Sequence, residues 1–350
     1  MFRIGLACTA SLVIYFAAFA WLLDRPLTLG ALRAQMEANV ALGEAIHEPK
    51  LVILAGSNGP YSHRCETIGP IIHRPCINAG VAVGVGLDYL FTRWKPLLHP
   101  GDIVYLPLEE AQYVRARAAA ELGPDAAIML RHDRATLWTL PPRRQIAALF
   151  SGDLRGAVMS VIETALAGDD FHDPRAAANG GFNAWGDHVG HSAALAVLNQ
   201  STLAAIVPDH PAAEAIRTGY GSVLVTGFLR WADLHGVRAI GGWPTGFADS
   251  PIGDSSVAAI RSIYRTDGAG FLELPNRSGY PRVAFFDTQN HLNEAAQKVH
   301  SVAIGEALVR LMDERPAAQS IMGQSIMGQS IMGQSIMGQA FMGQPREPSR

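Results

Sequence analysis

Short apolar runs of four to six residues recur along this chain, separated by longer segments with helical spacing. The runs lie at 50–55, 76–79, 102–107, 237–240, 271–274 and 283–286. Runs this short, bounded by glycine, proline and polar residues, are typical of strands buried on both faces. Helices are expected between them, within 112–166 and at 87–98, 212–235 and 293–312. The alternation predicts an α/β fold, a three-layer sandwich whose short, mostly parallel sheet is covered by helices.

The N-terminus begins with an almost continuous apolar run from Ile4 to Leu23. About 20 apolar residues are enough to cross a bilayer as a helix. Ala18-Phe19-Ala20 has the form of a signal-peptidase site, whereas Trp21 continues the run as an interfacial residue of an anchor would. We favour an uncleaved signal anchor over a signal peptide for residues 1–25. Both alternatives put the remainder outside the cytoplasm, either anchored to the inner membrane and facing the periplasm or secreted.

The remaining chain divides into three segments. Residues 26–49 are interpreted as a helical stalk, because apolar residues recur there at helical spacing. Residues 50–315 contain the strands and helices, with a loop at 169–192 whose Gly, Asp, His and Asn content predicts a functional loop. Residues 316–350 contain Ser-Ile-Met-Gly-Gln four times. A five-residue period fits no packing repeat, so this tail is expected to be disordered.

Charge and cysteine content exclude some classes of protein. The formal net charge is −3 and the basic residues are scattered singly, which argues against a nucleic-acid partner. No spacing of Cys and His suggests a metal site, and no cofactor is expected. Cys8 lies in the apolar N-terminal run, whereas Cys65 and Cys76 lie close together in the segment expected outside the cytoplasm. A Cys65–Cys76 disulfide is therefore predicted.

Ser57 and His291 are the candidate reactive residues. Ser57 directly follows the strand expected at 50–55, and His291 follows the last expected strand. Because the carboxyl ends of parallel strands meet at one edge of the sheet, these residues are expected to lie together. A histidine can take the serine proton, and a carboxylate can orient the histidine. Asp287 is the candidate carboxylate. By itself, Ser57 would more often be only a helix cap.

These residues resemble the conserved blocks of the SGNH (GDSL-like) hydrolases. Gly56-Ser57 is similar to the first block, Asp287…His291 to the last, and Ile77-Asn78-Ala79-Gly80 to the second. Membrane-anchored relatives also carry the pattern seen in Pro100-Gly101-Asp102-Ile103-Val104, Leu108-Glu109 and Gln112-Tyr113. The resemblance implies an SGNH-type fold, Ser57 as nucleophile and an oxyanion hole that includes the Ser57 and Gly80 backbone N–H groups.

The sequence departs from the family pattern at two positions. The third block usually supplies an asparagine to the oxyanion, but Glu109 stands at the matching strand end. A carboxylate cannot donate unless it is protonated, so either another donor such as Asn183 replaces it, Glu109 is neutral, or hydrolysis is slow. Asp287 also precedes the histidine by four residues instead of the family's three.

The resemblance implies acyl transfer through a serine ester. Relatives act on O-acyl groups of exported polysaccharides, often beside a membrane-bound O-acyltransferase. An esterase or acyltransferase acting on such a polysaccharide, for example bacterial cellulose, is therefore expected. Two alternatives remain: a catalytically weak or inactive scaffold subunit of a polysaccharide-export complex, which Glu109 would favour, and a lipase, for which 169–192 is unusually polar. Trp185, Trp231 and Trp243 are candidates for stacking on sugars.

Overall fold

A computed structural model describes residues 2–22, 27–149 and 181–313. Its centre is a five-stranded sheet in which all pairs of neighbours run parallel. The strands are, in spatial order, β2 (Cys76–Asn78), β1 (Leu51–Ile53), β3 (Ile103–Leu106), β6 (Arg238–Gly242) and β8 (Gly270–Leu272). The predicted parallel α/β sheet is confirmed. Two small pairs lie outside it: antiparallel β4 (Gly181–Phe182) with β5 (His188–Val189), and parallel β7 (Gly246–Phe247) with β9 (Gly279–Tyr280).

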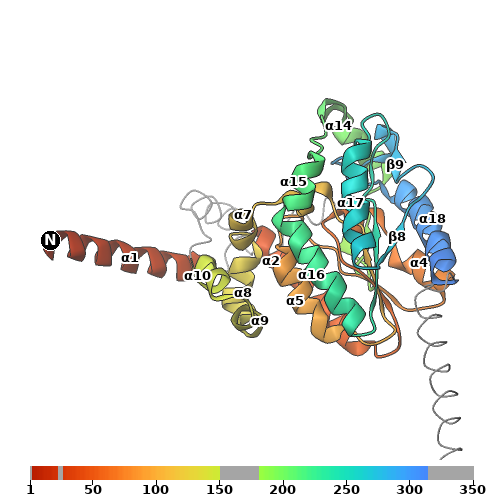
Figure 1. The fold of residues 1–350 in the computed structure, drawn as a ribbon. Helices are drawn as coiled ribbons and strands as arrows, with labels where there is room; N and C mark the ends of the chain where they lie inside the picture. Colours follow the sequence, from red (N-terminus) through yellow and green to blue (C-terminus); the bar gives the residue numbers. More distant parts are fainter. Residues whose placement is uncertain (1, 23–26, 150–180, 314–350) are drawn as a thin grey trace, which may run out of the picture. The chain divides into compact units, whose positions relative to one another are not determined.

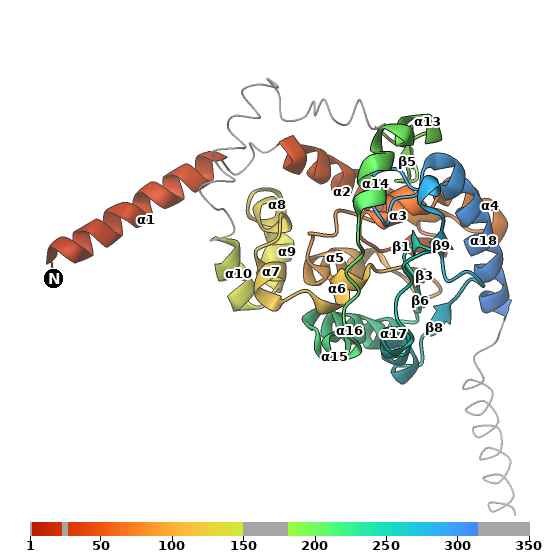
Figure 2. The same cartoon turned by 90° about the horizontal axis from the view of Figure 1, so that it is seen from above.

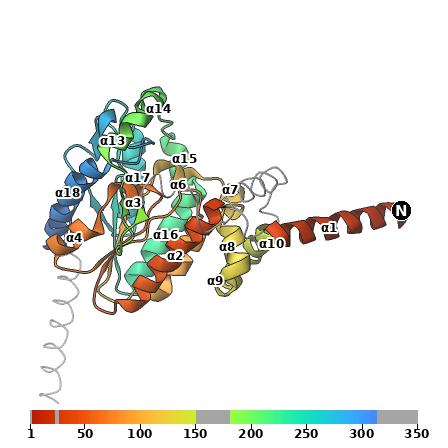
Figure 3. The ribbon, with the colours of Figure 1, turned by 180° about the vertical axis from the view of Figure 1, so that it is seen from behind.

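Helices cover the sheet on both faces (Figures 1 and 2). The first face carries α2 (Leu27–Ala45), α5 (Leu87–Trp94), α16 (Tyr220–Leu234) and α17 (Asp254–Thr266). The second face carries α3 (Asn58–Ser62), α4 (Cys65–Ile72) and α18 (Glu294–Asp313). Seen from behind, α2 and α16 lie on one side, with α4 and α18 on the other (Figure 3).

The other described helices are short, apart from α1. They are α1 (Phe2–Leu22), α6 (Glu110–Val114), α7 (Arg117–Glu121), α8 (Asp125–His132), α9 (Arg134–Thr139), α10 (Pro142–Ala148), α13 (Ala193–Ala196), α14 (Gln200–Ala205) and α15 (Ala213–Thr218). The described residues also include three turns of 3-10 helix: η1 (Lys95–Leu97), η2 (Val197–Asn199) and η3 (Arg282–Ala284).

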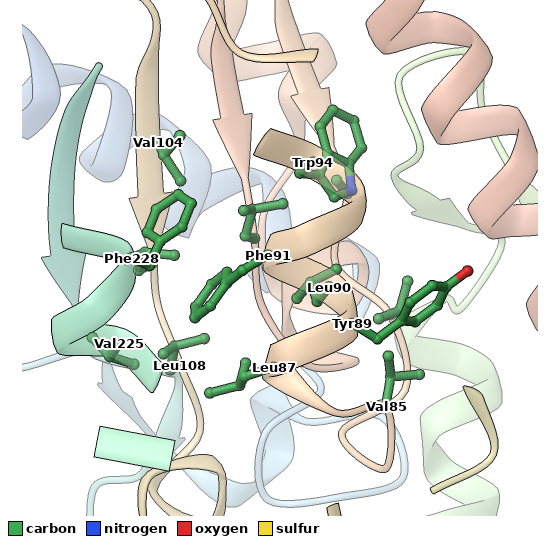
Figure 4. Packing of buried hydrophobic residues seen from close by; sticks show 14 of the residues in the cluster. Val85, Leu87, Tyr89, Leu90, Phe91, Trp94, Val104, Leu108, Val225 and Phe228 are labelled. Atoms are coloured by element: carbon green, nitrogen blue, oxygen red, sulfur yellow. The ribbon is translucent and has the colours of Figure 1, made fainter. Parts of the chain in front are cut away.

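The sheet is buried on both faces because its central strands β1 and β3 carry apolar or aromatic side chains at every position. Val52 and Val104 point toward α5 and α16, in the largest apolar cluster. In that cluster the ring of Phe91 on α5 stacks on Phe228 of α16 with centroids 4.4 Å apart (Figure 4). On the opposite face, Tyr105 meets the ring of His63, at a centroid distance of 5.5 Å. Both layers therefore fix the sheet that carries the candidate site.

Two expected elements take a different form. The strand expected at 283–286 is wrong: Arg282–Ala284 form η3, and Phe285 makes only an isolated antiparallel bridge to Leu292. Phe285 is fully buried in a small separate cluster with Phe247, so its apolar character reflects a different burial site. The helix expected at 212–235 is broken into α15 and α16 at Gly219, whose backbone is extended.

Two expected segments are only partly described. Part of the loop expected at 169–192 is the β4–β5 hairpin, and residues 169–180 lie outside the described residues. The helices expected at 112–166 form five short helices up to Ala148, and 150–166 lie outside the description. The disordered tail expected at 316–350 also lies outside the described residues.

The segment interpreted as a stalk belongs to the folded unit. α2 forms as predicted, but Leu32, Met36 and Val40 are 7%, 7% and 5% exposed. Its Gln35 Nε2 also donates to the carbonyl of Gly80 at 3.0 Å. The described residues up to Leu308 belong to one compact unit. Helix α2, within the predicted stalk, is thus a layer of this unit and not a separate stalk.

The apolar N-terminal segment forms helix α1, with Ile4 and Ile14 70% and 69% exposed. Across the part of the chain that the structure describes, no helix combines the length and the apolar character needed to cross a membrane. The N-terminal membrane helix expected from the sequence is therefore without support from the structure.

The Pro100–Val104 motif has a structural role. Asp102 is fully buried and pairs with the buried ammonium group of Lys50 at 3.0 Å. It also accepts hydrogen bonds from the backbone N–H groups of Lys50 and His99. Because Lys50 precedes β1 and Asp102 precedes β3, the pair ties the entry points of the two strands that lead to the candidate site.

Cys65 and Cys76 are joined by a disulfide, with their Cα atoms 5.1 Å apart. The bond links the start of α4 to the start of β2 across a sequence separation of 11 residues. Replacing both cysteines by alanine is expected to lower the free energy of unfolding by about 3 kcal/mol, because a loop of this size is no longer closed in the unfolded chain. Denaturant titration measures the loss, and intact mass with and without reductant reports the bond. Two freely alkylated thiols in the native protein would contradict it.

His63 is expected to make folding sensitive to acid. It is fully buried beside His300, and burial lowers its pKa from 6.5 to about 4 against the opposing hydrogen bonds of nearby carbonyls. Between these two pH values the unfolded chain binds more protons, so the free energy of unfolding falls as pH falls, by up to about 3 kcal/mol from this residue. His63→Phe should show a shallower pH dependence in denaturant titrations. An unchanged slope would contradict the assignment.

Candidate active site

Ser57 and Glu109 lie at the carboxyl ends of two neighbouring strands. Ser57 follows β1 and Glu109 follows β3, and β1 and β3 are hydrogen-bonded neighbours. The chain that leaves β1 runs to β2 on one side of this pair, and the chain that leaves β3 runs to β6 on the other side. The order of the strands therefore reverses between β1 and β3. Ligands of open α/β sheets bind at such a reversal point. The topology therefore puts both residues where a site is expected.

The side chain of Ser57 does not cap helix α3. Ser57 occupies the position before the first helical residue, but its backbone is already helical and its hydroxyl makes no capping bond. The hydroxyl instead contacts His291, with 2.7 Å between Oγ and Nε2. The helix-cap interpretation of Ser57 therefore does not describe what its side chain does.

His291 connects Ser57 to Asp287. Its second ring nitrogen, Nδ1, lies 2.7 Å from Asp287 Oδ1. An N–H at Nδ1 donates to the carboxylate, which leaves Nε2 as an acceptor for the serine hydroxyl. His291 is 9% exposed, so the relay is sheltered but can be reached. The structure thus brings together all three predicted residues of a serine–histidine–acid relay.

The loop that carries Asp287 and His291 is closed at its base. Phe286 N–H donates to the carbonyl of His291 at 2.8 Å. The carbonyl of Asn290 accepts from the hydroxyls of Ser62 and Thr245, both at 2.8 Å. The loop is therefore fixed to the end of α3 and to the segment after β6. The extra residue between acid and histidine is accommodated here without lengthening the Asp287–His291 contact.

Replacing Asp287 by asparagine is expected to lower turnover by about 10²–10⁴-fold, less than the loss of Ser57. The amide cannot stabilise the imidazolium, and it favours the wrong tautomer of the histidine. kcat for a simple aryl acetate measures the effect. Asp254→Asn, on an acid 91% exposed, is the control. Unchanged turnover in Asp287→Asn would show that another acid, or none, supports His291.

A stack of rings that the sequence did not reveal holds His291. The ring of Tyr61 lies between His291 and His188, each 4.0 Å away and nearly parallel to it. His188 Nδ1 lies 3.1 Å from His191 Nδ1. Burial lowers the pKa of His188 to about 3 and that of His191 to about 4, so both rings are neutral near pH 7. The only sequence signal was the histidine-rich loop, since stacking between distant residues leaves no local pattern.

Gly80 lies against α3, whereas Asn183 is engaged elsewhere. A Cβ at Gly80 would lie 2.8 Å from the Cα of Gly59, so only glycine permits this approach. The Gly80 N–H makes a single long bond of 3.4 Å, to Asn78 Oδ1, which leaves it available to a ligand.

The Asn183 amide donates to Asp187 and accepts from two backbone N–H groups of its own hairpin. Asn183 is thus accounted for as a hairpin residue.

A cleft of about 250 Å³ opens beside Glu109 and the His291 loop. Polar side chains line much of it: Glu109, Glu110, Asp209, His210, Asn276, Gln289 and Asn290. Within it, His210 Nδ1 pairs with Glu110 at 2.7 Å. Trp243 also borders the cleft but is 2% exposed, while Trp185 is 40% exposed on the β4–β5 hairpin. Within the described ranges, no cluster of His, Cys, Asp and Glu is arranged to hold a metal ion.

No protein-family model matches this chain, and no match was found among the curated proteins or the solved structures.

Proposed function

We propose that this chain is an extracytoplasmic serine acyl-transfer protein that acts on O-acyl groups of an exported polysaccharide, for example bacterial cellulose. The observation that carries the proposal is the continuous hydrogen-bonded relay from Asp287 through His291 to Ser57, with both contacts at 2.7 Å. This arrangement activates a hydroxyl for attack on a carbonyl carbon. The resemblance to the SGNH hydrolases, proposed from sequence blocks, supports the same chemistry.

In the proposed reaction, Ser57 Oγ attacks the carbonyl carbon of the ester while His291 Nε2 takes the hydroxyl proton. The tetrahedral oxyanion forms beside the Ser57 and Gly80 N–H groups. His291 then returns the proton to the departing sugar oxygen, which leaves an acyl ester on Ser57. Water, or a second sugar hydroxyl, attacks this ester, and His291 moves the proton back to Ser57. Water gives an esterase, and a sugar hydroxyl gives an O-acyltransferase.

The polar part of the cleft favours a hydroxylated substrate, and apolar residues such as Phe247 and Ile252 line the rest. Its volume of about 250 Å³ is small for a binding site, and its border carries carboxyl, amide and imidazole groups. Such groups bind sugar hydroxyls, whereas an acyl chain needs an apolar channel. Trp185, the most exposed of the three candidate stacking residues, lies on the β4–β5 hairpin and is not among the residues that line the cleft.

An extracytoplasmic location is part of the proposal. The Cys65–Cys76 disulfide is stable in oxidising compartments, and the apolar N-terminal run would export the folded unit as a periplasmic, inner-membrane-attached or secreted protein. A membrane-bound O-acyltransferase that delivers acyl groups is the proposed partner.

Two measurements test the function. A fluorophosphonate probe should label the native protein and leave Ser57→Ala unlabelled. Acyl esters on the surface polysaccharide should change when Ser57→Ala replaces the native chain in its host. The alternative, a non-catalytic scaffold of an export complex, is favoured by the carboxyl group of Glu109 beside the nucleophile. A folded native protein that takes no label would support the scaffold and contradict acyl transfer.

A further inference from the structure

Glu109 faces the nucleophile instead of pointing away from it. Its Oε1 accepts the backbone N–H of Asn58, the residue after the nucleophile, at 3.4 Å. A Cβ on Gly56, the residue before the nucleophile, would lie only 2.5 Å from the same oxygen. Glycine at position 56 is therefore required for this approach. The carboxyl group also borders the substrate cleft.

The position of Glu109 is fixed by its own helix. Gln112 Oε1 accepts the backbone N–H of Glu109 at 3.0 Å, at the first turn of α6. The next residue, Tyr113, bonds through its hydroxyl to Tyr264 of α17 at 2.8 Å and is fully buried. The Leu-Glu…Gln-Tyr pattern of the sequence therefore serves to hold Glu109 at the end of β3.

The side chain of Asn58 places a second oxygen acceptor near Gly56. The side-chain amide of Asn58 donates to the carbonyl of Pro107 at 2.7 Å, which turns its Oδ1 the other way. That Oδ1 is buried and, within the described residues, has no hydrogen-bond partner. The position of a Cβ on Gly56 lies 3.3 Å from Asn58 Oδ1 and 2.5 Å from Glu109 Oε1. Two oxygen acceptors therefore lie on the same side of Gly56, and an unpaired acceptor near a carboxylate makes its charged form less favourable.

The surrounding charges do not neutralise a Glu109 carboxylate. Glu110, on the same helix, is itself acidic and is paired with His210. Asp209 adds a further acid along the cleft. From the loop before α18, His291 faces Glu109 but is engaged by Ser57 and Asp287. Burial raises the pKa of Glu109, Glu110 adds to this, and His291 and the Asn58 N–H oppose it.

We propose that Glu109, as a neutral carboxylic acid, is the third oxyanion donor of this site and stands in for an asparagine side chain. Its O–H donates to the oxyanion that forms when Ser57 attacks, and its other oxygen keeps the Asn58 N–H. No proton leaves Glu109 in this role, and the charge balance of acyl transfer is unchanged. The inference rests on the proposed acyl transfer at Ser57.

The test compares two substitutions, measured as kcat/KM for an aryl acetate across pH. Glu109→Gln keeps a neutral donor at every pH, so it should retain activity within about threefold at the optimum. Glu109→Ala removes the donor and should lower kcat/KM by about 10²–10³-fold. The native profile should be bell-shaped, because a neutral histidine and a protonated Glu109 are both needed. In the Glu109→Gln variant, the fall in kcat/KM at high pH should be absent. Glu214→Gln, on a glutamate 74% exposed, is the control.

The outcomes separate this inference from the proposed function. If Glu109→Ala equals or exceeds the native activity, or Glu109→Gln keeps the fall at high pH, Glu109 is no donor although Ser57 remains active. A tenfold or greater rise in Glu109→Asn and Glu109→Ala together would show a suppressing carboxylate. If the native protein neither turns over ester nor takes the fluorophosphonate label, acyl transfer itself is overturned, and this inference with it. Should Glu109→Ala not fold, the pH profile of Glu109→Gln still decides.

Discussion

Ser57→Ala and His291→Ala are each expected to lower the turnover of an aryl acetate by at least about 10⁴-fold, and the double variant to be no worse than either single one. The reason is that the two side chains act as one unit: Nε2 of His291 lies 2.7 Å from Oγ of Ser57, and neither can perform the proton transfer alone. Steady-state kinetics of the three variants measure the effect, and fluorophosphonate labelling provides an independent reading.

Matched controls for this prediction lie on exposed parts of the fold. Ser201→Ala, in α14, and His235→Ala, after α16, remove the same groups outside the site and should leave turnover unchanged. Thermal melting of each variant separates lost chemistry from lost folding. If Ser57→Ala or His291→Ala keeps native turnover, the relay is not the reactive centre. Losses that multiply in the double variant would show that the two residues act separately.

Asp187→Ala is expected to cause the largest loss of stability, about 3 kcal/mol or more in the free energy of unfolding. Asp187 is 0% exposed and its carboxylate accepts four hydrogen bonds of 2.7–3.1 Å. The donors are Cys65 N, Glu66 N, Asn78 Nδ2 and Asn183 Nδ2. Alanine leaves buried donors unpaired at the start of α4 and at the end of β2, next to Gly80. Urea titration measures the loss.

The exposed acid Asp254 provides the comparison for Asp187. Its side chain is 91% exposed and paired only with Arg277, so Asp254→Ala should change stability by no more than about 0.5 kcal/mol. A loss below about 1 kcal/mol in Asp187→Ala would mean that water replaces the carboxylate. Because Asp187 joins the β4–β5 hairpin to β2, the variant should also lower turnover even where it remains folded.

Much of the fold could be predicted from local patterns. The strands at 51–53, 76–78, 103–106 and 238–242 are short apolar runs ended by polar or glycine residues, and this pattern is set by the residues of each run alone. The strand expected at 283–286 had the same pattern, yet it became η3 and an isolated bridge. An apolar run must be buried, but its sequence does not specify whether it is buried in the central sheet or in a separate apolar cluster.

The candidate site divides in the same way. Ser57, Asp287 and His291 could be chosen from the sequence, because a reactive serine after a strand and a histidine before a last helix are both readable along the chain. The ring stack of Tyr61 on His291 could not, since its members are 230 positions apart and stacking leaves no periodic signal. Nor could the sequence tell that Asn183 serves its own hairpin, where its amide bonds to Asp187.

The sequence by itself determined the order of strands and helices, the residue types at the sheet edge and the pair of cysteines, because these follow from the period and composition of short segments. Tertiary structure alone decided that α2 is a layer of the fold, that Gly56 admits the carboxyl group of Glu109, and that this group meets Asn58 beside the nucleophile. Those contacts join residues about 50 positions apart, and their distances depend on how β1 and β3 pair.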